Sequence, residues 1–209
     1  MTLPARQPVA VAITGASGAQ YALRLLECLI EADEQVYLML SEPGQIVIGM
    51  ETDLSLPGRS RDIQRFLTEY FAAEEGQLQV FGRKEWTAPV ASGSSAPRAM
   101  TVCPCTMGTL ASIACGASGN LIERAADVMI KEGRKLILVP RETPFSAIHL
   151  ENMLRLARLG VVMLAANPGF YHRPQTLEDI VDFVVARILD QLEVPHTLSS
   201  RWGDLFEEE

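Results

Sequence analysis

The sequence has no excess of positive charge and no long apolar run. The first absence argues against a nucleic-acid-binding protein, and the second argues against a membrane-spanning one. Over 209 residues the formal net charge is -8, which argues against a nucleic-acid partner because such proteins need a contiguous cationic face. No apolar run approaches the roughly 18–20 residues that span a bilayer, and the N-terminus lacks the cleavage pattern of a signal peptide. We therefore expect a cytoplasmic protein without a membrane span.

Cysteine is scarce, and its spacing suits neither a disulfide framework nor a zinc site. Cys28, Cys103, Cys105 and Cys115 lie in apolar contexts that are typical of strand or helix interiors. Cys103 and Cys105 frame a proline, and alternation along a strand would put both on one face. No Cys/His pair at finger-like spacing completes a tetrahedral site, so we assign no metal and expect structural cysteines.

Apolar, β-branched runs alternate with segments of helical spacing along the chain. The small residues at 91–97 predict a loop. The expected strands are 9–14, 36–40, 78–81, 100–103, 135–139 and 161–165. The expected helices are 18–32, 46–50, 63–71, 121–131, 148–159 and 176–192.

Alternating strands and helices predict an α/β fold with a three-layer, doubly wound, mostly parallel sheet, flavodoxin-like or Rossmann-like. With 48% hydrophobic residues the chain can bury one sizeable core. We expect a single domain over 1–209, with a C-terminal tail from about 193. In such sheets ligands bind at the carboxyl ends of the strands.

The turn after the first strand, Thr14-Gly15-Ala16-Ser17-Gly18, has the features of an anion site. Its glycines permit a tight turn, its N–H groups and the dipole of the following helix favour an anion, and the Ser17 hydroxyl can add a hydrogen bond. The turn lacks the full dinucleotide fingerprint G-x-G-x-x-G, and Ser41 ends the second strand where an acidic ribose partner would stand. A mononucleotide such as FMN fits better, and the alternative is a plain tight turn.

Two more small-residue turns, at 92–95 and 106–109, carry hydroxyl and N–H groups that could bind a flavin's ring edge and ribityl chain, or be surface turns only. Several cations also stand near predicted strand ends. With Tyr171 they could bind a second phosphate through charge-assisted hydrogen bonds. These cations are Arg124, Lys131, Arg141 and Arg187. For each of them an ordinary surface salt bridge is the alternative.

Two carboxylates and two tryptophans complete the candidate residues. Glu51 and Glu142 lie near strand-end loops, where a carboxylate could move protons, although a solvated charge or a helix cap is the simpler interpretation. The ring faces of Trp86 and Trp202 could stabilise a transient allylic cation, or the two residues could pack in a core or an interface.

Six blocks of the sequence together resemble the UbiX family of flavin prenyltransferases, and they cover nearly the whole chain. They are TGASGAQYALRLLE, ASGSSAP, CPCTMGTLA, NLIERAADVMIKE, VPRETPFSAIHLENM and PGFYHRPQTLEDIVDFVVARILD. The resemblance implies an FMN-bound flavodoxin-like domain, assembled as a homododecamer. It would transfer a dimethylallyl group from dimethylallyl monophosphate to nitrogen 5 and carbon 6 of reduced FMN. The product, prenylated FMN, would serve UbiD-type decarboxylases, including the one of ubiquinone biosynthesis.

The same resemblance implies roles for individual residues. Positions that match the family's FMN contacts are Gly15, Ala16, Ser17, Ser41, Thr106, Met107, Gly108, Thr109 and Arg141. Positions that resemble its prenyl-phosphate clamp, some of them reaching in from a neighbouring subunit, are Arg124, Lys131, Tyr171 and Arg187. Glu142 is similar to the proton relay to the leaving phosphate, and Ser17 to the group that assists later proton removal, with Glu51 nearby. Trp86 and Trp202 match aromatic residues around the prenyl group.

The sequence has no Asp-Asp-x-x-Asp-like cluster of the kind that holds Mg²⁺ in enzymes that ionise prenyl diphosphates. A monophosphate held by Arg, Lys and Tyr, with a proton from Glu142, would need no metal. Two rival hypotheses stay open. One is a flavin-dependent cysteine decarboxylase on a related fold, whose catalytic His we do not find here. The other is an FMN carrier without chemistry, which leaves the clamp residues without a joint task.

Overall fold

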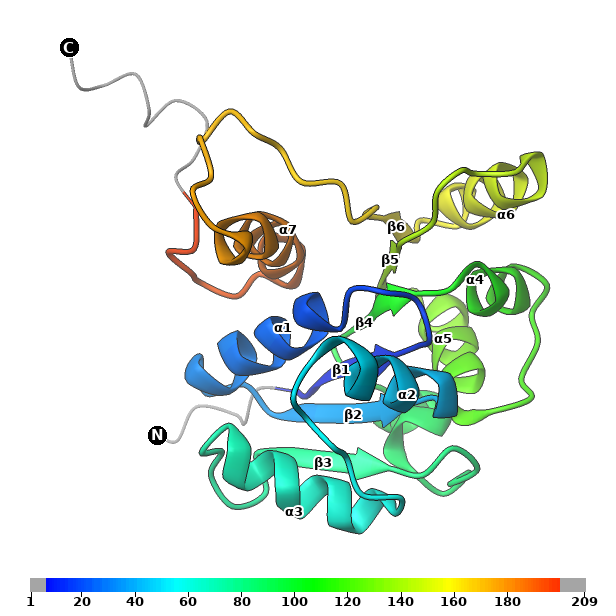
Figure 1. The fold of residues 1–209 in the computed structure, drawn as a ribbon. Coiled ribbons are helices and arrows are strands. Elements are labelled where there is room, and N and C mark those ends of the chain that lie inside the picture. The colour runs from blue at the N-terminus through cyan, green and yellow to red at the C-terminus, as the bar shows by residue number, and fades with distance from the viewer. Residues whose placement is uncertain (1–6, 200–209) are drawn as a thin grey trace, which may run out of the picture.

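The computed structural model describes residues 7–199 and forms one parallel sheet with helices on both faces (Figure 1). The strands are β1 (Val9–Ile13), β2 (Val36–Leu40), β3 (Leu78–Phe81), β4 (Ala99–Cys105), β5 (Lys135–Pro140) and β6 (Val162–Met163). The helices are α1 (Ala19–Glu31), α2 (Glu42–Glu51), α3 (Ser60–Tyr70), α4 (Met107–Ala114), α5 (Leu121–Lys131), α6 (Ala147–Arg158) and α7 (Leu177–Leu192). Two 3₁₀ turns, η1 (Pro89–Ala91) and η2 (Gly93–Ser95), precede β4. The predicted doubly wound α/β fold is confirmed.

The strand order is β3-β2-β1-β4-β5-β6, and the pairings are parallel. The chain starts at β1 in the middle, builds outward to β3, crosses to β4 on the other side of β1, and builds outward to β6. The order therefore reverses between β1 and β4. The crevice at the carboxyl ends of two such strands is where doubly wound sheets bind ligands.

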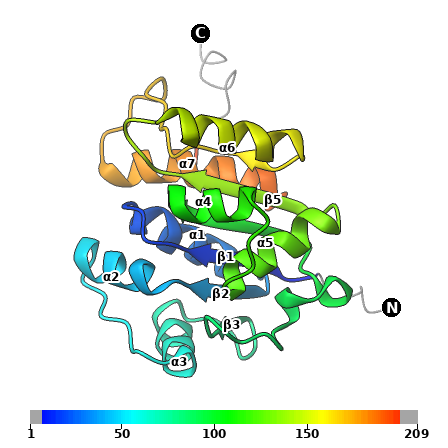
Figure 2. The same cartoon turned by 90° about the vertical axis from the view of Figure 1, so that its right-hand side faces the viewer.

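Two apolar clusters fill the space on either side of the sheet. One joins Val9, Val11 and Ile13 of β1 to α1, α3 and α7, and the other joins Ala10 and Ala12 to α4, α5 and α6. Because successive strand residues point to opposite faces, a strand buried on both faces consists of an unbroken apolar run, as β1 does. Figure 2 shows α4, α5 and α6 covering the second of these faces.

The prediction that Cys103 and Cys105 share one face of a strand is wrong. The pairing of β4 with β5 shifts register between Val102 and Cys105, so Cys103 joins the cluster under α1 and α7 while Cys105 joins the opposite cluster. Cys28 is buried as expected, whereas Cys115, just after α4, is exposed. Among residues 7–199, no three His, Cys, Asp or Glu side chains form a group that could hold a metal.

Several element boundaries differ from the prediction; for example, α3 begins at Ser60 rather than at 63, and β4 runs on to Cys105 rather than ending at 103. The helix expected at 46–50 begins at Glu42, because the Ser41 hydroxyl accepts a hydrogen bond from a backbone N–H of its first turn. The strand expected at 161–165 is reduced to Val162–Met163 at the sheet edge. The expected loop before β4 also contains η2. Within the described part of the chain, no helix has the length and apolar character needed to cross a bilayer.

Candidate functional site

Thr14, the residue after β1, joins the first turn to the end of β4. Its Oγ1 donates to the carbonyl oxygen of Pro104 at 2.8 Å and accepts from the Thr106 N–H at 2.9 Å. Thr14 is 2% exposed, so these hydrogen bonds form out of water and fix the backbone. The two predicted ligand turns, at 14–18 and 106–109, therefore lie together where the strand order reverses.

The turn requires glycine at two positions for different reasons. A Cβ at Gly15 would lie 2.4 Å from the Cβ of Pro43, so only glycine allows α2 to pack this close to the turn. Gly18 has a φ of 115°, which side chains rarely permit. Gly15 therefore lets α2 pack against the turn, and Gly18 lets the chain enter α1 with a positive φ.

Glu51, the last residue of α2, caps the N-terminus of α1. Its Oε2 accepts the N–H groups of Gly18 at 2.8 Å and Ala19 at 2.9 Å, and the Ser17 hydroxyl donates to the same carboxylate. Gly18 is the N-cap residue of α1 and has no side chain with which to do this. A carboxylate of the protein itself thus occupies the positive end of the α1 dipole, and the helix-cap interpretation of Glu51 is confirmed.

Arg141, just beyond β5, extends this cluster. Its Nε donates to the carbonyl oxygen of Ser17 at 3.2 Å. Burial alone would raise the pKa of Glu51, but hydrogen bonds from Ser17, Ala19 and Gly18, together with the positive charge of Arg141, hold that pKa below its usual value. Ser17, Glu51 and Arg141 therefore form one charged, hydrogen-bonded group.

A cavity of 310 Å³ opens at Pro43, with Ser41 and Thr109 in its wall. Ser41 is the N-cap of α2, and Asn120, also in the wall, is the N-cap of α5. Thr109 belongs to the first turn of α4, where the Oγ1 of the N-cap Thr106 accepts from its N–H at 3.1 Å and lies 2.9 Å from its Oγ1. Three helix N-termini therefore meet at one cavity, an arrangement that favours an anion.

The remaining residues predicted to contact FMN offer backbone rather than side-chain groups. Ala16 and Met107 are buried, with the Met107 side chain packed in the core, and Gly108 has no side chain. Their N–H groups lie in a turn and at a helix start, where the backbone has donors to spare.

Arg124 and Lys131 lie about two turns apart on α5, which packs against η1. The Arg124 Nε donates to the carbonyl oxygen of Ala91 at 3.1 Å, and Lys131 pairs with Glu132. A Cβ at Gly93 would lie 3.0 Å from the Lys131 Nζ. These two cations and the small-residue segment before β4 therefore form one surface.

Tyr171 and Arg187 lie with α7, in the other layer of helices. Arg187 pairs with Asp190 at 2.7 Å, and Tyr171 packs edge-on against Phe183 with ring centroids 5.7 Å apart. The apolar side of α7 packs into the cluster with α1, whereas α5 packs into the opposite cluster. Within one chain, Arg124 and Lys131 therefore lie in a different helix layer from Arg187.

The other predicted residues lie near the carboxyl edge or outside the described part. Glu142 follows Arg141, and its Oε1 accepts the Thr143 N–H at 3.2 Å. Trp86, before η1, is 48% exposed and is not a core residue. Trp202 lies outside the described residues.

Sequence reasoning assigned no side-chain role to three residues of this region: Thr14, Asn120 and Arg83. Thr14 is a hydroxyl at a strand end, and Asn120 stands three residues before Glu123 at the start of an amphipathic helix, which is an N-cap signal. Arg83, in the turn after β3, lines the 310 Å³ cavity and carries no sequence signal.

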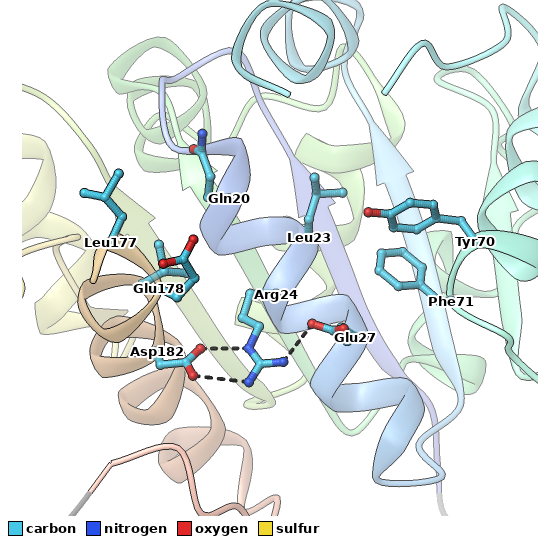
Figure 3. Close-up of a pocket in the computed structure, with 10 residues that line it drawn as sticks. Gln20, Leu23, Arg24, Glu27, Tyr70, Phe71, Leu177, Glu178 and Asp182 are labelled. Atoms are coloured by element: carbon cyan, nitrogen blue, oxygen red, sulfur yellow. Dashed lines mark hydrogen bonds and ion pairs between the residues drawn. The ribbon is translucent and has the colours of Figure 1, made fainter. Parts of the chain in front are cut away.

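A larger cavity of 620 Å³ is lined by residues of α1 and α7 and by Tyr70 and Phe71 at the end of α3 (Figure 3). Arg24 crosses it, with Nε and Nη2 at 2.7 and 3.2 Å from the Asp182 carboxylate and Nη1 at 2.7 Å from Glu27. No predicted site residue is among its lining residues. Its basic group is already paired with two carboxylates, so it does not compete with the smaller cavity as an anion site.

Comparisons with known proteins identify relatives of this chain among flavoproteins. A family model described as Flavoprotein matches residues 3–189. The flavin prenyltransferase UbiX of Pseudomonas aeruginosa is 58% identical over 196 residues, which cover 94% of each chain.

Solved structures of UbiX-type proteins have a similar fold. The crystal structure of AnUbiX (PadA1) in complex with FMN and dimethylallyl pyrophosphate is 37% identical, covers 95% of this chain and 98% of its own, and has a TM-score of 0.84. A dodecameric FMN-dependent UbiX-like decarboxylase from Escherichia coli O157:H7 is 42% identical, covers 93% and 98%, and has a TM-score of 0.81.

Proposed function

Because the chain belongs to the flavoprotein family and, within it, to the UbiX flavin prenyltransferases, we propose that it transfers a dimethylallyl group from dimethylallyl monophosphate to reduced FMN. Bonds form at nitrogen 5 and carbon 6 of the flavin, and the product is prenylated FMN. The observation that carries this proposal is the meeting of three helix N-termini on one cavity beside the mononucleotide turn, where the strand order reverses.

The residues at the carboxyl edge fit FMN. The cavity offers the hydroxyls of Ser41 and Thr109 and the amide of Asn120, all of which can donate to a phosphate. The turn at Gly15 lacks the full G-x-G-x-x-G of a dinucleotide site, which favours a mononucleotide. When bound, reduced FMN supplies the nucleophilic nitrogen and carbon of the transfer.

The remaining residues act on the second substrate. Arg124, Lys131, Tyr171 and Arg187 hold its phosphate through charge-assisted hydrogen bonds, which strengthen as negative charge develops on the departing anion. Glu142 supplies a proton to that phosphate. Ser17, held by the carboxylate of Glu51, assists the later removal of a proton. Trp86 and Trp202 lie around the prenyl group, where their ring faces stabilise the transient allylic cation.

The clamp residues require assembly. Arg124 and Lys131 lie in the helix layer opposite to Arg187, so a single site gathers all of them only from more than one chain. We propose a homododecamer, the state of the E. coli relative. Each chain contributes one FMN-binding domain over 1–209, with a tail from about 193.

The product is not an end point. Prenylated FMN passes to UbiD-type decarboxylases as their cofactor, including the one of ubiquinone biosynthesis, and we place the protein in the cytoplasm. A decarboxylase that depends on prenylated FMN is therefore the partner in function, and the transfer itself needs no metal.

The test is anaerobic and metal-free. Protein, reduced FMN and dimethylallyl monophosphate are incubated, and the extracted flavin is weighed by mass spectrometry. The proposal expects the mass to rise by one five-carbon unit. Unchanged flavin would favour an FMN carrier, and release of CO₂ from a cysteine-ending peptide would favour a cysteine decarboxylase.

Glu142→Gln separates binding from chemistry in the same assay. The amide keeps the size of the side chain but cannot give up a carboxylic proton, so the transfer slows by about 10²–10⁴-fold. FMN binding, followed by flavin fluorescence, stays at the wild-type value. Loss of FMN together with activity would show that Glu142 belongs to the cofactor site.

A further inference from the structure

Arg83 is the cation of the 310 Å³ cavity. Among the described residues that line this cavity, Arg83 alone carries a positive charge, and Ser41 and Thr109 line the same cavity. Neither the FMN contacts nor the phosphate clamp assigned above includes it.

The backbone holds Arg83 at this place. Its carbonyl oxygen accepts the N–H of Leu121, the first residue of α5, at 2.9 Å. Asn120, the N-cap residue of α5, lines the same cavity as Arg83. The N–H of Gly82, the residue before Arg83, donates to Glu85 Oε2 at 2.8 Å, and this hydrogen bond fixes the turn after β3. The backbone of Arg83 is thus anchored, while its side chain is 59% exposed.

The present partner of this guanidinium is weak. Arg83 Nη1 lies 3.6 Å from Glu42 Oε2, and the Glu42 side chain is 78% exposed. An exposed ion pair at this distance contributes little, and Glu42 can remain in water at the start of α2 without it. A dianionic phosphate inside the cavity would attract Arg83 more strongly than Glu42 does.

The other cation near the cofactor turn is already engaged. The charge of Arg141 acts on Glu51, and its Nε donates to the Ser17 carbonyl oxygen. The Glu51 carboxylate in turn occupies the first N–H groups of α1. The anion-binding position at the N-terminus of α1 is therefore occupied by Glu51. The cavity at the N-termini of α2, α4 and α5 is the position left for the phosphate of a ligand.

We propose that Arg83 binds the phosphate group of FMN in the 310 Å³ cavity, in exchange for its contact with Glu42. This inference rests on the FMN site proposed above. Arg83 is a binding residue here and takes no part in the transfer itself. The guanidinium offers several N–H donors in one plane, which suits two phosphate oxygens at once.

The test compares FMN with riboflavin, which lacks the phosphate. Flavin-free protein is titrated with each flavin, and binding is followed by fluorescence quenching. For Arg83→Gln we expect the Kd of FMN to rise about tenfold or more and the Kd of riboflavin to stay unchanged. For Glu42→Gln we expect the Kd of FMN to fall about two- to fivefold, again with riboflavin unaffected.

Arg65→Gln is the matched control, because Arg65 is exposed on α3, pairs with Asp62, and does not line the cavity. It leaves both constants unchanged. Equal weakening of FMN and riboflavin by Arg83→Gln, or no weakening of either, would overturn the inference while leaving FMN binding by the wild type in place. Failure of the wild type to bind FMN would overturn the proposed function as well.

Discussion

Glu51 occupies the place where α1 most readily accepts negative charge, and three hydrogen bonds and a nearby arginine favour its ionised form. From the sequence, Glu51 is only one carboxylate near a strand-end loop. Its partners Gly18 and Ala19 lie more than 30 residues earlier in the chain, so no local pattern connects them. The structure shows that Glu51 holds the Ser17 turn in place as well as lying beside it.

Replacing Glu51 with Gln tests this role through pH. The amide can still accept an N–H but carries no charge, so at neutral pH we expect the variant to be less stable by about 1 kcal/mol. Since the folded-state pKa of Glu51 is lowered, the stabilisation by the carboxylate is complete above its unfolded-state pKa. It is lost as the pH falls through the lower folded-state pKa.

The measurement is thermal unfolding of both proteins across the acidic range. The two melting temperatures should differ near pH 7 and converge at low pH. Glu75→Gln, at an exposed position after α3, is the control, and we expect it to leave the melting temperature unchanged at both neutral and low pH. A difference that persists below the folded-state pKa would show that the side chain acts by packing alone.

At the scale of elements, the site depends on how closely α2 approaches the turn after β1. Periodicity predicts β1 and α1, which flank this turn, because β1 is an unbroken apolar run and α1 shows helical spacing. The contact between Gly15 and Pro43 could not be predicted, since it depends on the position of α2 in space. The register shift in β4 escaped prediction for the same reason, because pairing with β5 determines it.

Gly15→Ala tests the approach of α2. The added Cβ would lie 2.4 Å from the Pro43 Cβ, so the turn or α2 must move, at a cost of about 1–3 kcal/mol. We expect a lower melting temperature and weaker FMN binding, measured by thermal unfolding and by flavin titration. Gly58→Ala is the control, because a Cβ there meets nothing within 4 Å. Equal effects of the two substitutions would refute a specific contact at Gly15.

At the scale of the whole molecule, the residues predicted to bind FMN and those predicted to bind the second phosphate are arranged differently. The two turns predicted to bind FMN, at 14–18 and 106–109, come together within one chain at the carboxyl edge of the sheet, the place where a doubly wound fold binds its ligand. Of the residues predicted to bind the second phosphate, Lys131 and Arg187 lie on α5 and α7, which cover opposite faces of the sheet (Figure 1). A sequence places residues along one chain and carries no direct signal of which subunit completes a site.

If Lys131 and Arg187 hold the same phosphate, they do so from different chains. Removing one well-placed donor to a developing anion costs on the order of 10²–10³-fold in rate, so Lys131→Ala and Arg187→Ala should each be nearly inactive alone. In mixed assemblies, about one site in four combines an intact Lys131 from one chain with an intact Arg187 from another.

The most direct test is therefore to co-express the two variants with different tags, isolate the mixed oligomers, and measure flavin prenylation. Oligomers that mix two differently tagged Lys131→Ala chains are the control and stay inactive. We predict that the Lys131→Ala and Arg187→Ala mixture recovers up to about a quarter of the wild-type rate. Mixed oligomers that form but remain as inactive as each variant alone would contradict a site shared between subunits.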